Sequence, residues 1–247
     1  MILGIVEERV ATLLEEEGDP DDHNIDHGVE DQFDDPISTT KLRIENDGQT
    51  NAKPSQPRSV LDHLARVQAL LVYQTIRLFD GDPRSRIMAE SLIPVLSRWC
   101  KQMIDSALLS SQYVNSATSS INAKGQANFE KKLNSDWNAW ILAESVRRTW
   151  LVAGHMQCIY RLLSYGFTTC PGGLMFTTRA GLWQAESAYE WWAKFREKDV
   201  LFCPSLDSGK YLLKPGVTSP DDVDDFGRFV LRIIEGEERV DKWLAVS

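Results

Sequence analysis

The feature that most constrains this chain is a tryptophan-rich stretch between Asp136 and Trp192. It holds six of the chain's eight tryptophans, which are Trp137, Trp140, Trp150, Trp183, Trp191 and Trp192. Its first part repeats large apolar residues at helical spacing, at Trp137, Trp140, Ile141, Trp150, Leu151, Ile159, Leu162 and Leu163. This spacing predicts a central helix over residues 129–165 with one continuously apolar face. Such a helix, at about 37 residues, is longer than usual, so we expect a break near Gly154.

Three charged residues lie inside this apolar helix: Glu144, Arg147 and Arg148. Glu144 and Arg148 are four residues apart with the acid nearer the N-terminus, which is the favourable order for a helical ion pair. Charges persist inside a protein when they are paired. We therefore predict that Glu144 and Arg148 pair and are largely buried, within a structural ion-pair network. The alternative interpretation is a polar anchor in an apolar pocket that holds a carboxylate-bearing small molecule.

The overall charge disfavours direct nucleic-acid binding by this chain. Its 247 residues carry a net charge of −9, whereas proteins that bind DNA or RNA usually present a basic face. The four cysteines lack CxxC spacing, so we predict no structural zinc site. No basic leader accompanies the first apolar run, and no stretch reaches the ~20 apolar residues that cross a bilayer. These features predict a soluble intracellular protein with reduced thiols.

The first 57 residues differ in composition from the rest. Between Glu7 and Asp47 there are fifteen acids and three bases with few large apolar residues, which is typical of a disordered segment. A short amphipathic helix over residues 2–14 is expected before this run, and a Pro/Ser/Gln linker at residues 50–57 follows it. We predict a solvated acidic tail over residues 1–57. The alternative is an acidic activation segment, although such segments interleave acids with aromatics and only Phe33 fits.

Residues 58–247 show the patterns of an all-α domain of six to eight irregularly packed helices. Ser59 or Asp62 is expected to cap a helix that ends near Phe79. A second helix over residues 83–109 should kink at Pro94. The polar residues 110–126 are typical of an exposed loop.

The C-terminal part of this domain carries further helix signals. A helix is predicted over residues 187–196. Ser219 and Pro220 have the pattern of a strong helix start, with a capping hydroxyl and proline at the first position. Gly236 should end that helix before a short terminal one.

Other residues whose side chains could bind a metal or act in catalysis have simpler structural explanations. His155 and Cys158 share one face of the central helix, but a metal site needs further ligands and HxxC alone is a weak signal. Cys170 precedes a Pro-Gly-Gly turn, and no catalytic signature surrounds it. The acids at 221–225 lack the spacing of a calcium loop and suit helix capping and a solvated face. We therefore assign no catalytic, cofactor-binding or metal-binding residue.

Several stretches of the chain resemble a known family. The stretches are LARVQALLVYQTIRLFDGDPRSRIMAESLIPVLSRW, WNAWILAESVRRTWLVAGHMQCIY, CPGGLMFTTRAGLWQAESAYEWW and DVDDFGRFVLRIIEGEERVDKW. Together they are similar to the C-terminal regulatory part of fungal transcription factors of the binuclear zinc-cluster family, over about residues 61–244. The most specific pieces are the RLFDGD turn and the WxxWxxAESVRRTW helix, which are distinctive of a subgroup often found beside secondary-metabolite genes.

The resemblance implies an all-helical regulatory domain, a nuclear location, and control of genes transcribed by RNA polymerase II, commonly as a dimer. The chain departs from the family in its N-terminal segment. The family's DNA-binding module uses six cysteines in a basic segment, whereas the first sixty residues here are acidic and contain no cysteine. Zinc and direct DNA binding are therefore not carried over from the resemblance.

Two functional hypotheses follow. The first is a transcription regulator that retains only the regulatory domain, is located in the nucleus, and contacts a full-length zinc-cluster factor or a second copy of itself, with a small molecule as effector. The second is a small-molecule-binding protein, or a cofactor-free biosynthetic enzyme, recruited from this fold and cytoplasmic. The non-enzymatic hypothesis is favoured. The candidate ligand-binding residues are Trp140, Glu144, Arg147, Arg148, His155 and Trp183, with Cys170 near the mouth of the site.

Overall fold

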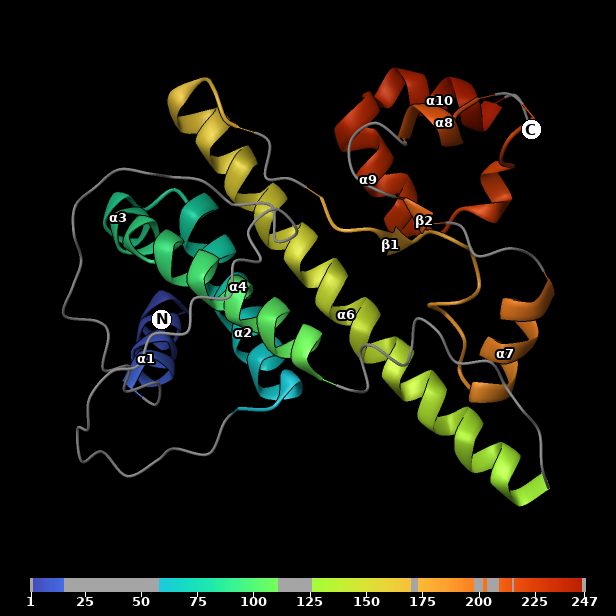
Figure 1. The fold of residues 1–247 in the computed structure, drawn as a ribbon. Helices are drawn as coiled ribbons and strands as arrows, with labels where there is room; N and C mark the ends of the chain where they lie inside the picture. Colours follow the sequence, from blue (N-terminus) through green and yellow to red (C-terminus); the bar gives the residue numbers. More distant parts are fainter. Residues whose placement is uncertain are drawn as a thin grey trace, which may run out of the picture. The chain divides into compact units, whose positions relative to one another are not determined.

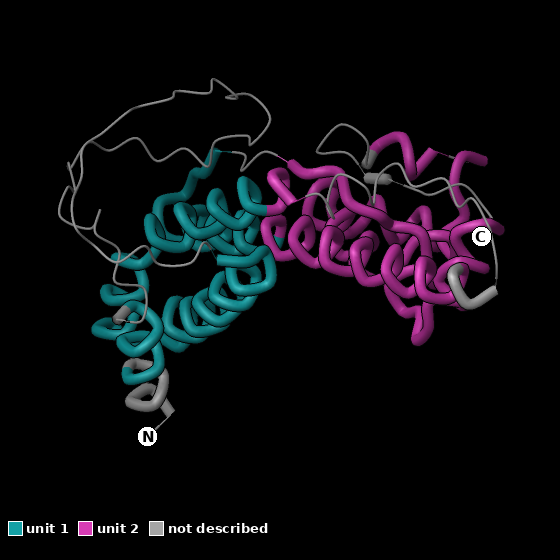
Figure 2. The backbone as a smooth tube through the Cα atoms, turned by 60° about the horizontal axis from the view of Figure 1, so that its bottom comes forward, with its two compact units in different colours: residues 1–106, 152–171 teal, residues 107–151, 172–247 magenta. Residues whose placement is uncertain are grey.

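The computed structural model describes residues 2–15, 58–110, 126–169, 173–197, 202–203, 209–214 and 216–245. Helices dominate these residues, which confirms the predicted all-α class (Figure 1). The chain divides into two compact units (Figure 2): unit 1 comprises residues 1–106 and 152–171, and unit 2 comprises residues 107–151 and 172–247. The predicted acidic tail beyond residue 15, most of the predicted loop at 110–126, and Cys170 lie outside the described residues.

Unit 1 contains α1 (Ile2–Glu15), α2 (Val60–Phe79), α3 (Pro83–Ser91) and most of α4 (Ile93–Leu109). Ser59 caps α2 in a capping box, because its hydroxyl accepts from the Asp62 amide at 3.2 Å and the Asp62 carboxylate accepts from the Ser59 amide at 2.9 Å. The core of this unit is built from apolar side chains that include Leu64, Val67, Leu70, Leu78, Leu96, Trp99 and Met103. The expected helix over residues 2–14 is thus confirmed as α1, and Ser59 is the cap of α2.

The predicted kink at Pro94 is a full break between α3 and α4. Leu92 ends α3, and its amide bonds the carbonyl of Ala89 at 3.2 Å, as in a tightened last turn. Pro94 has no amide hydrogen, and its ring disfavours a helical carbonyl four residues earlier. The chain therefore restarts at Ile93 as a new helix.

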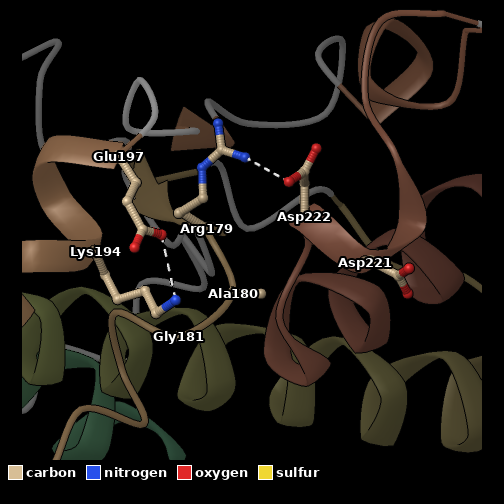
Figure 3. A pocket seen from close by; sticks show the side chains of 7 residues that line it. All are labelled: Arg179, Ala180, Gly181, Lys194, Glu197, Asp221 and Asp222. Atoms are coloured by element: carbon tan, nitrogen blue, oxygen red, sulfur yellow. Dashed lines mark hydrogen bonds and ion pairs between the residues drawn. The ribbon is translucent and has the colours of Figure 1, made fainter. Parts of the chain in front are cut away.

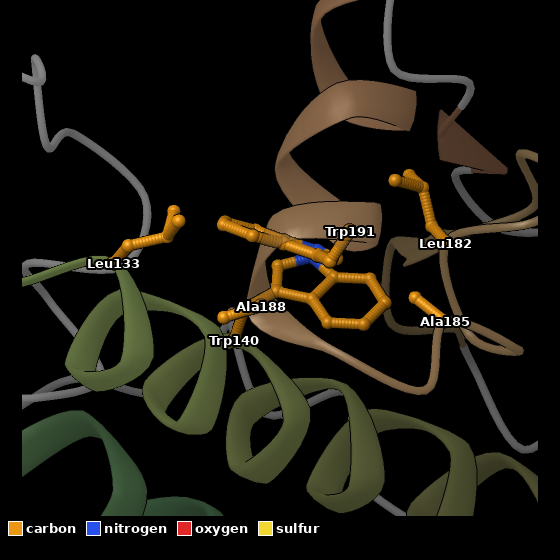
Figure 4. Close-up of a cluster of buried hydrophobic side chains, with 6 residues drawn as sticks. All are labelled: Leu133, Trp140, Leu182, Ala185, Ala188 and Trp191. Atoms are coloured by element: carbon orange, nitrogen blue, oxygen red, sulfur yellow. The ribbon is translucent and has the colours of Figure 1, made fainter. Parts of the chain in front are cut away.

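Unit 2 is assembled around α6 (Gln126–Tyr165), which belongs to it as far as Leu151. Its other helical elements are α7 (Ala188–Glu197), α8 (Gly209–Leu212), the 3₁₀ turn η1 (Pro220–Asp222), α9 (Asp225–Glu235) and α10 (Glu237–Ala245). Two short strands, β1 (Phe176–Thr177) and β2 (Phe202–Cys203), pair antiparallel with Phe176 opposite Cys203. A cluster of buried apolar side chains joins the first half of α6 to α7 (Figure 4), and comprises Leu133, Trp140, Leu182, Ala185, Ala188 and Trp191.

The expected break of α6 near Gly154 is wrong, because α6 is one continuous helix of 40 residues (Figure 1). Gly154 is buried and does not have a positive φ angle. An interior glycine costs a helix only about 1 kcal/mol, which is less than the packing on both sides of it supplies. Length alone was therefore a poor predictor of a break.

The prediction of a single apolar face along the whole of α6 is also wrong. Ile159, Leu162 and Leu163 are 41%, 51% and 72% exposed. In this part of α6, which belongs to unit 1, the buried side chains are Ala153, Met156, Gln157 and Tyr160. The centre of this buried face lies about a third of a turn from Ile159, at roughly 100° per residue. The helix changes its buried face where it passes from one core to the other.

The predicted helix start at Ser219 is only a 3₁₀ turn, and α9 begins later with Asp224 as its cap. The reason is a tertiary contact. The Asp224 amide donates to the Thr178 carbonyl at 2.8 Å, and the Ala180 amide donates to the Asp222 carbonyl at 2.9 Å. Val223 is held extended by this pairing, with φ −106° and ψ 128°, so the helix cannot run through it.

Close packing at the start of α9 depends on a glycine. A Cβ atom at Gly227 would lie 2.9 Å from side-chain carbons of both Thr178 and Val223. The absent side chain therefore lets α9 approach the segment that follows β1. None of the described helices is long and apolar enough to cross a membrane.

Candidate functional site

A cluster of buried charges joins α6, β1 and α9 in unit 2. Glu144 on α6 is fully buried, and its two carboxylate oxygens accept from different arginines: Arg147 at 2.6 Å and Arg148 at 3.0 Å. The amide of Thr177 in β1 also donates to Glu144, at 2.9 Å. Each carboxylate oxygen therefore has a hydrogen-bond donor, as a buried charge requires.

Arg148 extends the cluster to the C-terminal helices. Its Nη2 atom donates to Asp224 at 2.6 Å and to the Thr177 carbonyl at 2.9 Å. The guanidinium lies between two aromatic rings, 4.4 Å from the centroid of Trp183 and 4.7 Å from that of Phe226. Stacking between rings while bonding to two different carboxylates suits a planar guanidinium with several donors and would not suit lysine.

Asp224 completes the cluster and caps α9. One of its carboxylate oxygens accepts from Arg148, and the other accepts from the Gly227 amide at 2.7 Å. Burial raises the pKa of the Asp224 carboxyl, while the nearby positive charge of Arg148 opposes that rise. Two carboxylates and two guanidinium groups thus balance one another in a cluster that we call the charge lock, formed by Glu144, Arg147, Arg148 and Asp224.

The prediction that Glu144 and Arg148 pair and are largely buried is confirmed, since Glu144 is 0% and Arg148 8% exposed. The sequence interpretation missed Asp224, which it treated as a cap or a solvated acid. Asp224 lies 76 residues from Arg148, and no local pattern marks the pair.

The structure brings five of the six predicted ligand-binding residues into one region of unit 2. Trp183 stacks on Arg148, and the ring of Trp140 lies 6.3 Å from that of Trp183 and 5.8 Å from that of Trp191. His155, the sixth, belongs to unit 1. Each of the five residues contacts at least one of the others. None of them lines either of the two cavities described below. Their role in ligand binding stays a prediction.

A polar cavity of about 300 Å³ lies between α7 and η1 (Figure 3). Arg179 pairs across it with Asp222 at 3.0 Å, and Lys194 pairs with Glu197 at 3.2 Å. Gly181 has a positive φ of 86° and approaches Lys194 closely, because a Cβ atom there would lie 3.3 Å from the lysine side chain. The two ion pairs engage four of the charged groups of this cavity, and Asp221 is the fifth.

A larger cavity of about 1080 Å³ is lined by residues of α10 and by the chain from α8 to η1. The two cavities share Asp221 and Asp222, so η1 is a wall of both. In the larger one the indole nitrogen of Trp243 donates to the Thr218 carbonyl at 3.4 Å. The charge lock positions η1, because Asp224 lies two residues after its end and is bonded to both Arg148 and Thr178.

Metal ligands and nucleophiles do not gather in the described part of the chain. No group of three or more His, Cys, Asp or Glu residues there could hold a metal ion. The Cys158 thiol donates to the Thr169 carbonyl at 3.4 Å, and its neighbour His155 is half-buried. Burial raises the pKa of the Cys100 thiol to about 12, so Cys100 is held as the neutral thiol.

Comparison with known proteins gives one curated relative. The chain is 30% identical over 190 residues to transcription factor gsfR2 of Penicillium aethiopicum. The similar region covers 76% of this chain and 43% of that protein, so the chain spans less than half the length of the relative. No family model matches the chain, and no solved structure matches it. The chain is thus distantly related to a fungal transcription factor.

Proposed function

We propose that this chain acts in transcription, as a regulatory domain of the fungal binuclear zinc-cluster type that controls a secondary-metabolite gene cluster from the nucleus. The observation that carries this proposal is the similarity to a fungal transcription factor over 190 residues. The helical architecture agrees with the expectation drawn from the resemblance.

The proposed mechanism is contact between helix surfaces and a protein partner. With a net charge of −9, the chain itself is a poor ligand for DNA, so we expect it to contact a protein instead. That partner would be a full-length binuclear zinc-cluster factor or a second copy of the chain. Unit 2 presents several large apolar side chains to solvent on and near α7, including Trp183, Tyr189 and Phe195. Exposed apolar groups that lie near one another are common at protein interfaces.

The charge lock has a structural role in this proposal. It holds β1 and the start of α9 against α6, and so fixes which surfaces unit 2 presents. Every hydrogen bond of the charge lock described above joins two groups of the protein. This arrangement suits a role in positioning the helices better than a role in a reaction.

A tethering experiment tests the proposal. The chain is fused to a heterologous DNA-binding module in a fungal reporter strain, and a fluorescent fusion reports its location. We expect nuclear signal and a change in reporter transcription relative to the module alone, and Arg148→Met should abolish that change by disrupting unit 2. A cytoplasmic fusion with no effect on the reporter would contradict the proposal.

Affinity capture tests the partner. Tagged chain from fungal nuclear extract is analysed by mass spectrometry, with Arg148→Met as the matched bait. Recovery of a factor with a six-cysteine cluster, or of an untagged second copy, by the native bait alone is expected. Recovery of neither would leave the second hypothesis favoured, a small-molecule-binding protein or cofactor-free enzyme, for which the 1080 Å³ cavity is the supporting observation.

A further inference from the structure

The larger cavity of unit 2 concentrates positive charge in an acidic protein. Four basic residues line it, Lys210, Lys214, Arg239 and Lys242, against the two acids Asp221 and Asp222. The whole chain, by contrast, has 36 acids and 27 basic residues. A cavity with the opposite sign to the molecule around it attracts ligands that the rest of the surface repels.

Two of the four cations have no acidic partner among the described residues. Arg239 pairs with Glu235 at 2.6 Å, and Lys242 pairs with Glu238 at 2.7 Å. In each pair the acid lies four residues before the base. Lys210 and Lys214 are exposed, and no ion pair joins either of them to another described residue. Within the described part of the chain, Lys210 and Lys214 therefore have no acidic partner, and the Lys214 ammonium lies 5.6 Å from the centroid of the Tyr211 ring.

The acids of the cavity do not cancel this charge. Asp222 already pairs with Arg179 at 3.0 Å on the side of the smaller cavity. Asp221 is exposed at the rim, as Lys210 and Lys214 are, and offsets only one of their two charges. The site therefore keeps an excess of positive charge beside Lys210 and Lys214.

The rest of the lining is largely apolar and includes one unsatisfied polar group. Leu213, Val217 and the buried ring of Trp243 contribute apolar surface. Thr218 is 8% exposed; its buried hydroxyl has no hydrogen-bond partner among the described residues, and its carbonyl oxygen accepts from Trp243. The lining therefore offers an apolar wall near Lys210 and Lys214.

We propose that unit 2 binds an amphipathic organic anion in this cavity, with its carboxylate beside Lys210 and Lys214 and its apolar body against Trp243 and Val217. The volume of about 1080 Å³ is at the upper end for small-molecule sites, which suits a body of two or more fused rings. This inference concerns binding alone and holds whether or not the chain regulates transcription.

The test uses 2-naphthoate as the anionic probe and 2-naphthamide as its neutral isostere. Dissociation constants are measured on the full chain by ligand-observed NMR titration. The site variant is Lys210→Gln with Lys214→Gln. The matched control is Lys131→Gln with Lys194→Gln, which removes the same charge from exposed positions of unit 2 outside this cavity. Circular dichroism melting confirms that both variants fold.

We expect naphthoate to bind the native chain more tightly than naphthamide, and added salt to weaken naphthoate binding selectively. The site variant should bind naphthoate roughly tenfold more weakly, because the free cations are gone, while its naphthamide affinity and the control variant's naphthoate affinity stay unchanged. Equal affinities for the two probes, equal losses in the two variants, or no measurable naphthoate binding would each overturn the proposal. None of these outcomes depends on the reporter assay.

Discussion

Arg148 is the side chain on which most of the polar contacts of unit 2 converge. It bonds Glu144 from its own helix, Asp224 from the start of α9, and a β1 carbonyl, and it stacks on Trp183. A buried ion pair of this kind adds little net stability compared with an apolar replacement of the whole set. Removal of one partner, however, leaves the others charged and buried.

We therefore expect Arg148→Met to lower the free energy of unfolding by ~3–5 kcal/mol, because Asp224 and Glu144 lose a shared partner in a buried setting. Urea denaturation followed by circular dichroism measures the change. Arg232→Met is the matched control, since Arg232 forms an exposed pair with Asp241, and its loss should cost less than about 1 kcal/mol. Equal effects of the two substitutions would mean that the charge lock is not structural.

A second prediction at this scale concerns Cys100. Burial raises the pKa of its thiol to about 12, and its side chain is 0% exposed. In a variant with Cys158, Cys170 and Cys203 replaced by serine, we expect no reaction of a thiol reagent with the native protein at pH 8 and full reaction in urea. Ellman's reagent followed by absorbance is the measurement. Rapid labelling of the native variant would show that the core around Cys100 opens readily.

At the scale of elements, the start of α9 shows tertiary contacts prevailing over a strong local signal. Ser219 and Pro220 have the residue types of a helix start, yet the Ser219 side chain makes no capping bond. The cap is Asp224, five residues later, because the pairing of residues 178–180 with 222–224 keeps Val223 extended.

This assignment predicts unequal effects of two cap substitutions. Asp224→Ala should destabilise the protein by more than the ~0.5–2 kcal/mol of an ordinary cap, because it also removes a partner of Arg148. Ser219→Ala should cost only a few tenths of a kcal/mol, as a surface substitution without a bond does. Asp224→Asn should fall between them, since the amide oxygen can still accept from Gly227. Chemical denaturation measures the free energy of unfolding of the three variants. A larger loss of stability for Ser219→Ala than for Asp224→Ala would show that the cap is misassigned.

At the scale of the whole molecule, stability should depend on pH through His63 in unit 1. Its Nδ1 atom lies 2.7 Å from Arg66, and burial, aided by the charge of Arg66, lowers the pKa of His63 below 6.5. The unfolded chain therefore binds this proton more readily than the folded one. The His63 contribution to stability is present above pH 6.5 and is lost as the pH falls through the lower folded pKa.

We expect the free energy of unfolding to fall between pH 7 and pH 5 by more in the native chain than in His63→Gln, whose amide oxygen can still accept from Arg66. Denaturation at several pH values measures both slopes. Titration of the many carboxylates contributes to both slopes, and the two proteins share these groups. The difference between the slopes therefore reports the contribution of His63. Identical slopes would contradict the lowered pKa.

Much of the fold could be predicted from local pattern. The helices α1, α2 and α7, the break at Pro94 and the burial of Glu144 with Arg148 all follow from residues within a few positions of one another. The errors in α6 have a common cause. Periodicity shows which side chains are apolar but not which core each part of a long helix packs in, so the exposure of Leu163 and the continuity through Gly154 were both mispredicted.

The sequence by itself determined the helical class, the positions of most helices and the pairing within α6, because these depend on hydrogen bonds and side-chain spacing between near neighbours. Only the tertiary structure decided that Asp224 completes the charge lock, that α9 starts after Val223, and that the lysines at 210 and 214 line one cavity with Trp243. These features join segments far apart in the chain, and the free energy that selects them comes from burial and from satisfying buried charges, which no local pattern encodes.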